Sequence, residues 1–446
     1  MLQLETIAAL ATPAGRGGIG IIRISGSRVP EIAPIVLKTL KKLPPPRQAT
    51  FTEFVDKDGQ LLDQGLVLYF PAPHSFTGED VLELQGHGGM VVMDTLLKAI
   101  LAFGARLARP GEFSERAFLN GKIDLAQAEA IADLIDSAST QAARCALRSL
   151  QGEFSTAIHS LVEKLLRLHS YIEAGIDFVE EEIDLLADGQ VQQTLTDLLV
   201  YIDEILAKAQ QGYLLKEGMR LAIVGAPNVG KSSLLNRLAG RDTAIVTPIA
   251  GTTRDIVREQ ITLDGMPLHL IDTAGLRETT DIVEQEGIRR TKLALQEVDA
   301  VLLVIDNRYA SDAVPDTLLA DMPILPLIVR NKIDLSGHEP GMHANGTLYL
   351  SANTGVGIET LKTYLKHKMG LHSSTEGIFL ARRRHLTALQ QARTALVASL
   401  HYTQSRQNEL LAEELGQAQQ ALGEITGRVT TDDLLGRIFA TFCIGK

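Results

Sequence analysis

Small, cationic and hydroxyl-bearing residues at positions 225–232 have the spacing of a phosphate-binding loop. The segment reads GAPNVGKS, follows the apolar RLAIV and precedes the helix-like SLLNRLAG. Glycines let backbone amides wrap phosphates, while Lys231 suits the β- and γ-phosphates and the Ser232 hydroxyl suits Mg²⁺. The flanking strand and helix favour this interpretation over an ordinary glycine-rich turn.

Two further segments offer ligands for a metal ion and for a terminal phosphate. AGTTRD contains Thr252 and Thr253, whose hydroxyls can close on Mg²⁺ and the γ-phosphate. DTAG supplies the Asp272 carboxylate for the Mg²⁺ shell and the Gly275 amide for the γ-phosphate. Both segments stand in the chain order that a nucleotide-hydrolysing domain requires.

Two further motifs are suited to recognising the nucleotide base. NKID follows the apolar PLIVR, and its Asp334 carboxylate can accept both N–H groups on the ring edge of guanine, which adenine does not present. SAN, at 351–353, offers a backbone amide to the guanine O6. A site built on such pairing rejects the wrong base strongly, so the motifs predict GTP rather than ATP. The predicted GTP contacts are Asn228, Val229, Gly230, Lys231, Ser232, Ser233, Thr247, Pro248, Ile249, Ala250, Gly251, Thr252, Thr253, Asp272, Thr273, Ala274, Gly275, Asn331, Lys332, Asp334, Ser351, Ala352 and Asn353.

The residue types alone leave the groups that accelerate hydrolysis open. Leu276 follows DTAG, where many Ras-like GTPases carry the glutamine that orients the attacking water. Positive charge can come from Arg254 or Arg277, or from a monovalent cation held by the Asn228 side chain and by carbonyls of residues 247–252. The acidic candidates for orienting the water are Glu278, Glu284 and Glu286.

Hydrophobic periodicity predicts the elements that position these motifs. Residues 1–120 mix strand-like segments, GGIGIIRISG and DQGLVLYFPAP, with the helix-length GMVVMDTLLKAILAFG. Residues 218–370 alternate apolar strands with helices, which is typical of a doubly wound α/β domain with a mostly parallel sheet. One helical stripe of small residues precedes that domain, formed by Ala128, Ile131, Ile135, Ala138, Ala142, Cys145 and Ser149. Two stripes follow it, Leu386, Leu389, Ala392, Leu396 and Leu400, then Leu411, Leu415, Ala418, Leu422 and Ile425.

A chain of 446 residues is too long for a single hydrophobic core. Neither the helical segment before the nucleotide domain nor the one after it looks able to fold alone. The predicted fold class is therefore α/β and α, with an N-terminal α/β domain and one discontinuous helical domain into which a Ras-like nucleotide domain is inserted. The predicted boundaries are 1–120, 121–215, 216–369 and 370–446.

Composition excludes several classes of protein. The net charge of −11 argues against a broad surface that coats nucleic acid, and the densest basic cluster, ARRRH at 381–385, also suits a solvated helix start. Two cysteines, Cys145 and Cys443, make neither a disulfide framework nor a metal cluster, and core packing is the expected role of Cys145. No apolar run approaches the ~20 residues of a membrane span, and no targeting segment is recognisable, so we expect a cytoplasmic protein without membrane contact.

The chain resembles the MnmE (TrmE) family of tRNA-uridine-modification GTPases from end to end. Besides the nucleotide motifs, ATPAGRGGIGIIRISG, HSFTGEDVLELQGHGG, FLARRRHL and DDLLGRIFATFCIGK match motifs of that family. The resemblance implies an N-terminal folate-binding domain that forms homodimers and an FAD- and NADH-dependent partner, MnmG, in a heterotetramer. It also implies addition of an aminomethyl or carboxymethylaminomethyl group to C5 of the wobble uridine, position 34, of certain tRNAs. The implied one-carbon cofactor is 5-formyl- or methylene-tetrahydrofolate.

The resemblance also implies roles for individual residues. It places folate contacts at Arg23, Glu83, Lys122 and Lys446. It places K⁺ at Asn228, Thr247, Ile249 and Thr252, with Ile249 acting through its carbonyl, and Mg²⁺ at Ser232 and Thr253. Among the three acidic candidates it selects Glu284 as the residue that orients water. The role of the terminal Cys443 stays open.

Two other functions fit part of the pattern. A ribosome-assembly GTPase would share the nucleotide motifs, but it usually carries a basic RNA-binding domain, and this chain is acidic and lacks a KH-like GxxG segment after its nucleotide domain. A membrane-remodelling GTPase would need a basic amphipathic helix, which is not recognisable here.

Overall fold

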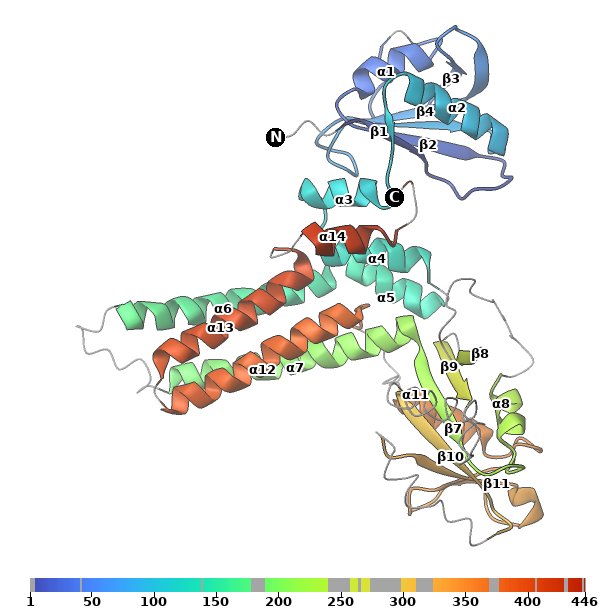
Figure 1. The fold of residues 1–446 in the computed structure, drawn as a ribbon, viewed down its shortest axis with the longest axis vertical. Helices are drawn as coiled ribbons and strands as arrows, with labels where there is room; N and C mark the ends of the chain where they lie inside the picture. The colour runs from blue at the N-terminus through green and yellow to red at the C-terminus, as the bar shows by residue number, and fades with distance from the viewer. Residues whose placement is uncertain are drawn as a thin grey trace, which may run out of the picture. The chain divides into compact units, whose positions relative to one another are not determined.

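The computed structural model describes residues 5–40, 42–137, 139–177, 189–239, 257–263, 266–272, 298–309, 324–368, 377–405, 407–428, 432–442 and 445. They divide into two compact units, whose helices and strands are labelled in Figure 1. The N-terminal unit comprises Met1–Ala132, Leu150–Ser170 and Leu415–Lys446, and the central unit comprises Asp133–Ser149 and Tyr171–Glu414. Each unit is described by itself below.

A six-stranded sheet forms the first part of the N-terminal unit. Its strands are β1 (Ile7–Leu10), β2 (Gly20–Ser25), β3 (Thr50–Val55), β4 (Leu61–Phe70), β5 (Val81–Gly86) and β6 (Arg106–Leu107). Their order is β3-β4-β5-β2-β1-β6, and every pair is antiparallel except β1–β6. Helices α1 (Val29–Val36) and α2 (Met90–Ala102) pack their buried residues on this sheet in one apolar core. The predicted strands and helix of this region are confirmed.

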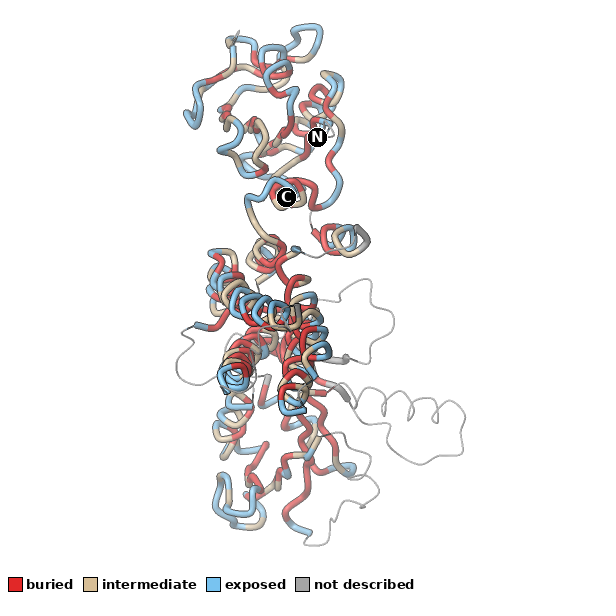
Figure 2. The backbone as a smooth tube through the Cα atoms, turned by 90° about the vertical axis from the view of Figure 1, so that its left-hand side faces the viewer, coloured by how far each residue is buried: buried red, intermediate tan, exposed pale blue. Residues whose placement is uncertain are grey.

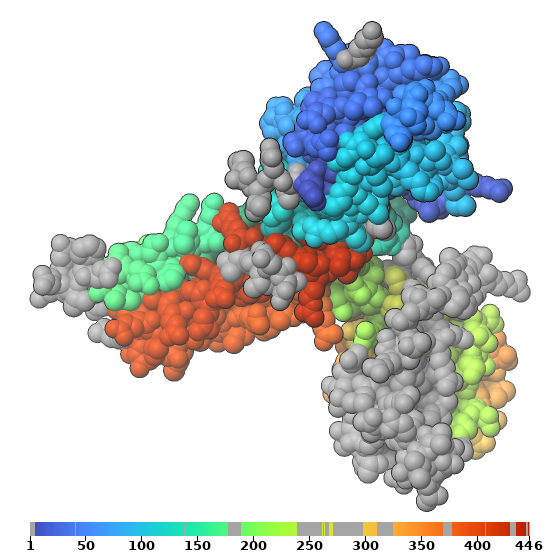
Figure 3. Space-filling view, turned by 45° about the horizontal axis from the view of Figure 1, so that its top comes forward, coloured from blue at the N-terminus to red at the C-terminus, as the bar shows by residue number. Residues whose placement is uncertain are grey.

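The end of the chain packs onto helices that follow this sheet. The helices concerned are α3 (Glu112–Leu119), α4 (Leu125–Ile135), α6 (Glu153–Asp177), α13 (Asn408–Thr426) and α14 (Asp432–Phe439). Phe439 and Phe442 bury their rings with Leu125 and Ala128 of α4. Figure 3 shows the C-terminal residues, in red, against the cyan residues that include α3. The first and last parts of the sequence therefore share one core.

The central unit contains a seven-stranded sheet. Its strands are β7 (Met219–Val224), β8 (Val257–Leu263), β9 (Met266–Asp272), β10 (Ala300–Asp306), β11 (Leu327–Asn331), β12 (Gly341–Met342) and β13 (Leu348–Tyr349). The order is β12-β13-β11-β10-β7-β9-β8, and the five inner strands are parallel. The antiparallel edge strands β8 and β12 were not predicted, but the mostly parallel, doubly wound sheet is confirmed.

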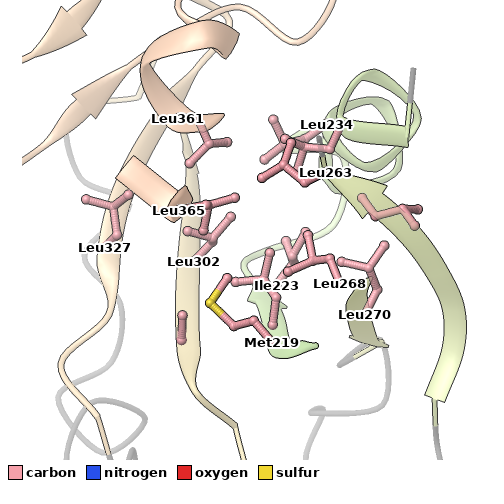
Figure 4. Close-up of a cluster of buried hydrophobic side chains, with 14 of the residues drawn as sticks. Met219, Ile223, Leu234, Leu263, Leu268, Leu270, Leu302, Leu327, Leu361 and Leu365 are labelled. Carbon is pink, nitrogen blue, oxygen red and sulfur yellow. The ribbon is translucent and has the colours of Figure 1, made fainter. Parts of the chain in front are cut away.

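Helices α8 (Lys231–Ala239) and α11 (Ile358–Lys368) contribute apolar side chains to the core of this sheet. In Figure 4, Leu361 and Leu365 of α11 lie near Leu302 of β10, and Leu234 of α8 lies beside Leu263 of β8. This core fixes the start of α8 at the carboxyl end of β7, where the predicted phosphate loop runs.

Helices from both sides of the nucleotide domain pair in the central unit. Helix α7 (Gln190–Glu217) runs along α12 (Arg383–Ser405), and Asp203 of α7 pairs with Arg393 of α12. Buried and exposed stretches alternate along the helices in Figure 2, as one-faced packing requires. The predicted fold class, with its discontinuous helical domain and inserted nucleotide domain, is confirmed, while the exact boundaries stay predictions.

The single helical stripe that was predicted from Ala128 to Ser149 is wrong in one respect. Helix α4 ends at Ile135, whose side chain is 46% exposed, and a second helix, α5 (Thr140–Leu150), begins after it. The Ser139 hydroxyl accepts a hydrogen bond from the Ala142 amide at 3.1 Å, which is an N-cap and explains the new start. Cys145 of α5 is buried in the central core, as expected for a packing residue.

Candidate nucleotide site

The predicted phosphate loop connects β7 to α8, and its geometry requires glycine at two positions. Gly225 has φ +155°, and a Cβ there would lie 2.2 Å from the carbonyl oxygen of Val304. Gly230 has φ +98°, and its Cβ would lie 2.3 Å from Nδ2 of Asn331. Any side chain at either position would push the loop away from its neighbours, so the loop conformation depends on both glycines.

Lys231 and Ser232 begin helix α8, where backbone amides without intrahelical partners favour anions. The Lys231 ammonium donates to the carbonyl oxygens of Gly225 at 2.7 Å and Ala226 at 2.9 Å, so it lies over the loop. Ser232 is exposed, and its hydroxyl is accessible to a cation as the Mg²⁺ prediction requires.

The buried Asn331 joins three of the predicted contact segments. Its Nδ2 donates to the carbonyl oxygen of Val229 at 2.8 Å, and its Oδ1 accepts from the amides of Lys332 at 2.8 Å and Ala352 at 2.9 Å. The phosphate loop, the NKID segment and the SAN segment therefore meet at one side chain. Asp334 is exposed, which leaves its carboxylate accessible to a base.

The SAN segment is held from the other side by α8. Arg237 donates from Nε to the carbonyl oxygen of Ala352 at 3.1 Å and from a terminal nitrogen to that of Asn353 at 2.6 Å. The Ser351 hydroxyl accepts from the Thr354 amide at 3.2 Å, which shapes the turn. Arg237 carries no predicted role; it lies in the last turn of α8.

Asp306 is a further residue of this site that sequence reasoning missed. It ends β10, its side chain is 5% exposed, and it pairs with Arg308 at 2.8 Å and with Lys332 at 2.7 Å. Hydrogen bonds from Arg308 and then Lys332 outweigh burial and hold the pKa of Asp306 well below its ordinary value. One feature of the sequence could have indicated Asp306: it is an acidic residue at the carboxyl end of an apolar strand. Ligands of parallel α/β sheets bind at the carboxyl ends of the strands.

Comparisons with known proteins agree with this geometry. Residues 6–122 match the N-terminal domain of the GTP-binding protein TrmE, and residues 125–443 match the MnmE helical domain. A protein of Pasteurella multocida named tRNA modification GTPase MnmE is 57% identical over 99% of this chain and 100% of its own length. A protein of Sodalis glossinidius with the same name is 56% identical over the full length of both chains. This chain belongs to the MnmE family.

Among solved structures, the G domain of the T. maritima FeoB iron transporter is 28% identical over 34% of this chain and 96% of its own length, at a TM-score of 0.25.

Several residues that the sequence analysis considered for GTP binding, metal binding or hydrolysis lie outside the described part of the chain. Only the backbone of Asp272, the last residue of β9, is described. The roles proposed for these residues stay predictions. Those outside are Thr247, Pro248, Ile249, Ala250, Gly251, Thr252, Thr253, Arg254, Thr273, Ala274, Gly275, Leu276, Arg277, Glu278, Glu284 and Glu286.

The N-terminal unit brings two of the predicted folate contacts together. Arg23 of β2 and Glu83 of β5 are paired in register, and their side chains form an ion pair at 2.9 Å. The Arg23 guanidinium carbon also lies 5.7 Å from the centre of the Phe113 ring and 5.9 Å from that of Phe76. The ion pair alone would serve a structural role. The Phe113 ring is buried, whereas the exposed Phe76 ring offers an apolar surface to a flat heterocycle.

The chain end reaches the same place. The Gly445 carbonyl accepts from Arg23 at 3.5 Å, and with φ +95° a Cβ on Gly445 would lie 2.2 Å from the carbonyl oxygen of Leu10. Lys446 lies outside the described residues. Within the part of the chain that the structure describes, no hydrogen bond or ion pair joins Lys122 to Arg23, and the Lys122 side chain lies close to Gly78.

The N-terminal unit also contains a buried network of ion pairs around Glu112, which was not predicted. Glu112 pairs with Arg106 at 2.6 Å and with Arg116 at 3.1 Å, and both Glu112 and Arg116 are 2% exposed. Burial acts to raise the pKa of Glu112, but hydrogen bonds from Arg106, the Arg109 amide and Arg116 together lower it to about 2. Arg116 also donates to Glu79, which tethers α3 to the loop before β5.

No helix within the described residues is long and apolar enough to cross a membrane.

Proposed function

We propose that this chain is a K⁺-dependent GTP hydrolase that acts in the modification of tRNA wobble uridines. The observation that carries the proposal is the junction at Asn331, where the phosphate loop, the NKID segment and the SAN segment meet. Full-length similarity to proteins named tRNA modification GTPases supports the substrate class.

In the proposed mechanism, Asp334 recognises guanine, and Lys231 with the amides at the start of α8 holds the phosphates. Mg²⁺, held by Ser232 and Thr253, would neutralise charge on the β- and γ-phosphates. These groups orient the nucleotide for in-line attack, in which positioning and electrostatics do most of the work.

The Leu276 side chain has no hydrogen-bonding group. Other groups must therefore orient the attacking water and supply the positive charge. Asn228, Thr247, Ile249 and Thr252 are the proposed K⁺ ligands, and K⁺ would supply the charge of an arginine finger. Glu284 is proposed to orient the attacking water. Binding of K⁺ and GTP would let two nucleotide domains meet face to face and exclude bulk water, which strengthens electrostatic stabilisation.

The proposed reaction on tRNA needs further components. In a homodimer associated with an FAD-dependent MnmG partner, the chain would add an aminomethyl or carboxymethylaminomethyl group to C5 of uridine 34. A tetrahydrofolate derivative would supply one carbon from a site made by Arg23, Glu83, Lys122 and Lys446. Glu83, paired with Arg23, could accept from the donor-rich edge of a pterin, and the exposed Phe76 ring beside Arg23 suits its flat shape. The proposed compartment is the cytoplasm.

Nucleoside analysis of tRNA tests this function. A strain that lacks its own enzyme and is complemented by this chain should regain the modified wobble uridine, whereas Lys231→Ala should not restore it. If the uridine stays unmodified while a ribosome-assembly defect is rescued, the alternative of a ribosome-assembly GTPase is correct.

A further inference from the structure

Asp306 is a buried carboxylate beside the nucleotide site, and no nucleotide motif includes it. Its Oδ2 accepts from the Lys332 ammonium at 2.7 Å, and Arg308 supplies the second cation at 2.8 Å. A carboxylate is costly to bury unless cations or donors compensate it, so its retention here calls for a reason.

Lys332 links Asp306 to the phosphate loop. The same ammonium that pairs with Asp306 donates to the backbone carbonyl of Asn228 at 2.5 Å. Asn228 has φ +64° and Lys332 has φ +68°, conformations that residues other than glycine adopt uncommonly. Such conformations persist when surrounding contacts hold them, and the lysine is one such contact for Asn228.

We propose that Asp306 is a positioning residue of the nucleotide site, which acts through Lys332 to fix the backbone of Asn228. This inference rests on the proposed function, because it links the guanine-recognising segment to the residue proposed to hold K⁺. Nucleotide affinity and the K⁺ requirement should then both depend on a carboxylate that does not itself belong to either binding motif.

Asp306→Asn tests the proposal, because it removes the charge and keeps the shape. The purified full-length chain is titrated with a fluorescent GDP analogue, and GTP hydrolysis is measured as a function of K⁺ concentration. We expect roughly tenfold weaker GDP binding, the effect of losing one charge-assisted hydrogen bond. The K⁺ concentration for half-maximal hydrolysis should rise in parallel, and Asp306→Glu, which restores the charge, should recover much of both losses.

Arg308→Ala is the matched control. It removes the other cation on Asp306 and leaves the pair with Lys332, so GDP affinity and the K⁺ requirement should stay within about twofold of wild type. A double-mutant cycle with Lys332→Met adds a readout that general destabilisation would not mimic. In the Lys332→Met background, Asp306→Asn should cause no further loss.

Three results would overturn the proposal: wild-type affinity and K⁺ requirement in Asp306→Asn, an equal loss in Arg308→Ala, or additive losses in the cycle. Should Asp306→Asn not fold, Lys332→Met alone decides, because an unchanged K⁺ requirement there contradicts the link to Asn228. A wild-type chain that neither binds GDP nor responds to K⁺ would instead contradict the proposed function.

Discussion

The carboxylate of Asp133 lies 2.7 Å from a guanidinium nitrogen of Arg382, although 249 residues separate them along the chain. The same carboxylate lies 3.2 Å from the ammonium of Lys216 and is 6% exposed. Lys216 stands near the end of α7, just before the nucleotide domain, and Arg382 immediately precedes α12. One buried carboxylate therefore holds both chain segments by which the sequence enters and leaves the nucleotide domain.

Asp133→Asn should lower the stability of the central unit by about 1–3 kcal/mol, because two cations lose a buried, hydrogen-bonded partner. Urea unfolding followed by circular dichroism measures the change. Asp203→Asn is the matched control, since the Asp203–Arg393 pair also joins the two helical arms but is 47% and 36% exposed. That variant should cost no more than about 1 kcal/mol, and equal losses in the two variants would contradict a special role for Asp133.

The ion network at Glu112 predicts a pH dependence of stability in acid. The folded-state pKa of about 2 lies below the ordinary 4.5. The contribution is therefore fully present above about pH 4.5 and is lost as pH falls towards 2. Glu112→Gln should lower stability by up to about 3 kcal/mol at pH 7. This deficit should shrink between pH 4.5 and pH 2 in unfolding curves, and a pH-independent deficit would show that packing, rather than charge, is responsible.

Hydrolysis should be fast in K⁺ and slow in Na⁺, whose radius fits the proposed cage of oxygen ligands poorly. Steady-state phosphate release in the two salts at equal ionic strength measures this difference. If Arg254→Ala or Arg277→Ala abolishes turnover while Na⁺ replaces K⁺ without loss, an arginine finger within the chain supplies the charge instead.

Glu284→Ala should bind GTP normally but hydrolyse it roughly 10²–10⁴-fold more slowly, because it loses the residue that orients water. Glu278→Ala and Glu286→Ala serve as neighbouring controls and should lose far less. Single-turnover hydrolysis with saturating K⁺ separates this chemical step from nucleotide binding. A larger loss in either control would move the proposed role to that residue.

Removal of the last four residues, 443–446, should abolish binding of 5-formyl-tetrahydrofolate and tRNA modification while GTP hydrolysis continues. Gly445→Ala should weaken folate binding in the intact chain, because φ +95° and the 2.2 Å approach of its Cβ to Leu10 displace the tail. Calorimetry measures both variants. Unchanged folate affinity in the truncation would show that the tail at Arg23 has no part in the site.

Local patterns in the sequence determined the motifs and most elements of this protein. The spacing of GAPNVGKS predicted a loop between a strand and a helix, and β7 and α8 flank it as expected. Alternating apolar segments predicted the parallel core of the sheet. These features are readable because hydrophobic period and glycine placement act over a few residues. The break between α4 and α5 was missed, although the cap at Ser139 is also a local signal.

Only the tertiary structure decided which distant side chains meet. Asp306 shows no motif, yet β10 ends where its carboxylate reaches Lys332, and Asp133 near the end of α4 meets Arg382 just before α12. Gly445 likewise reaches Arg23 from the far end of the chain. Such contacts depend on how whole helices and sheets bury their apolar faces against one another, and no short stretch of sequence contains that information.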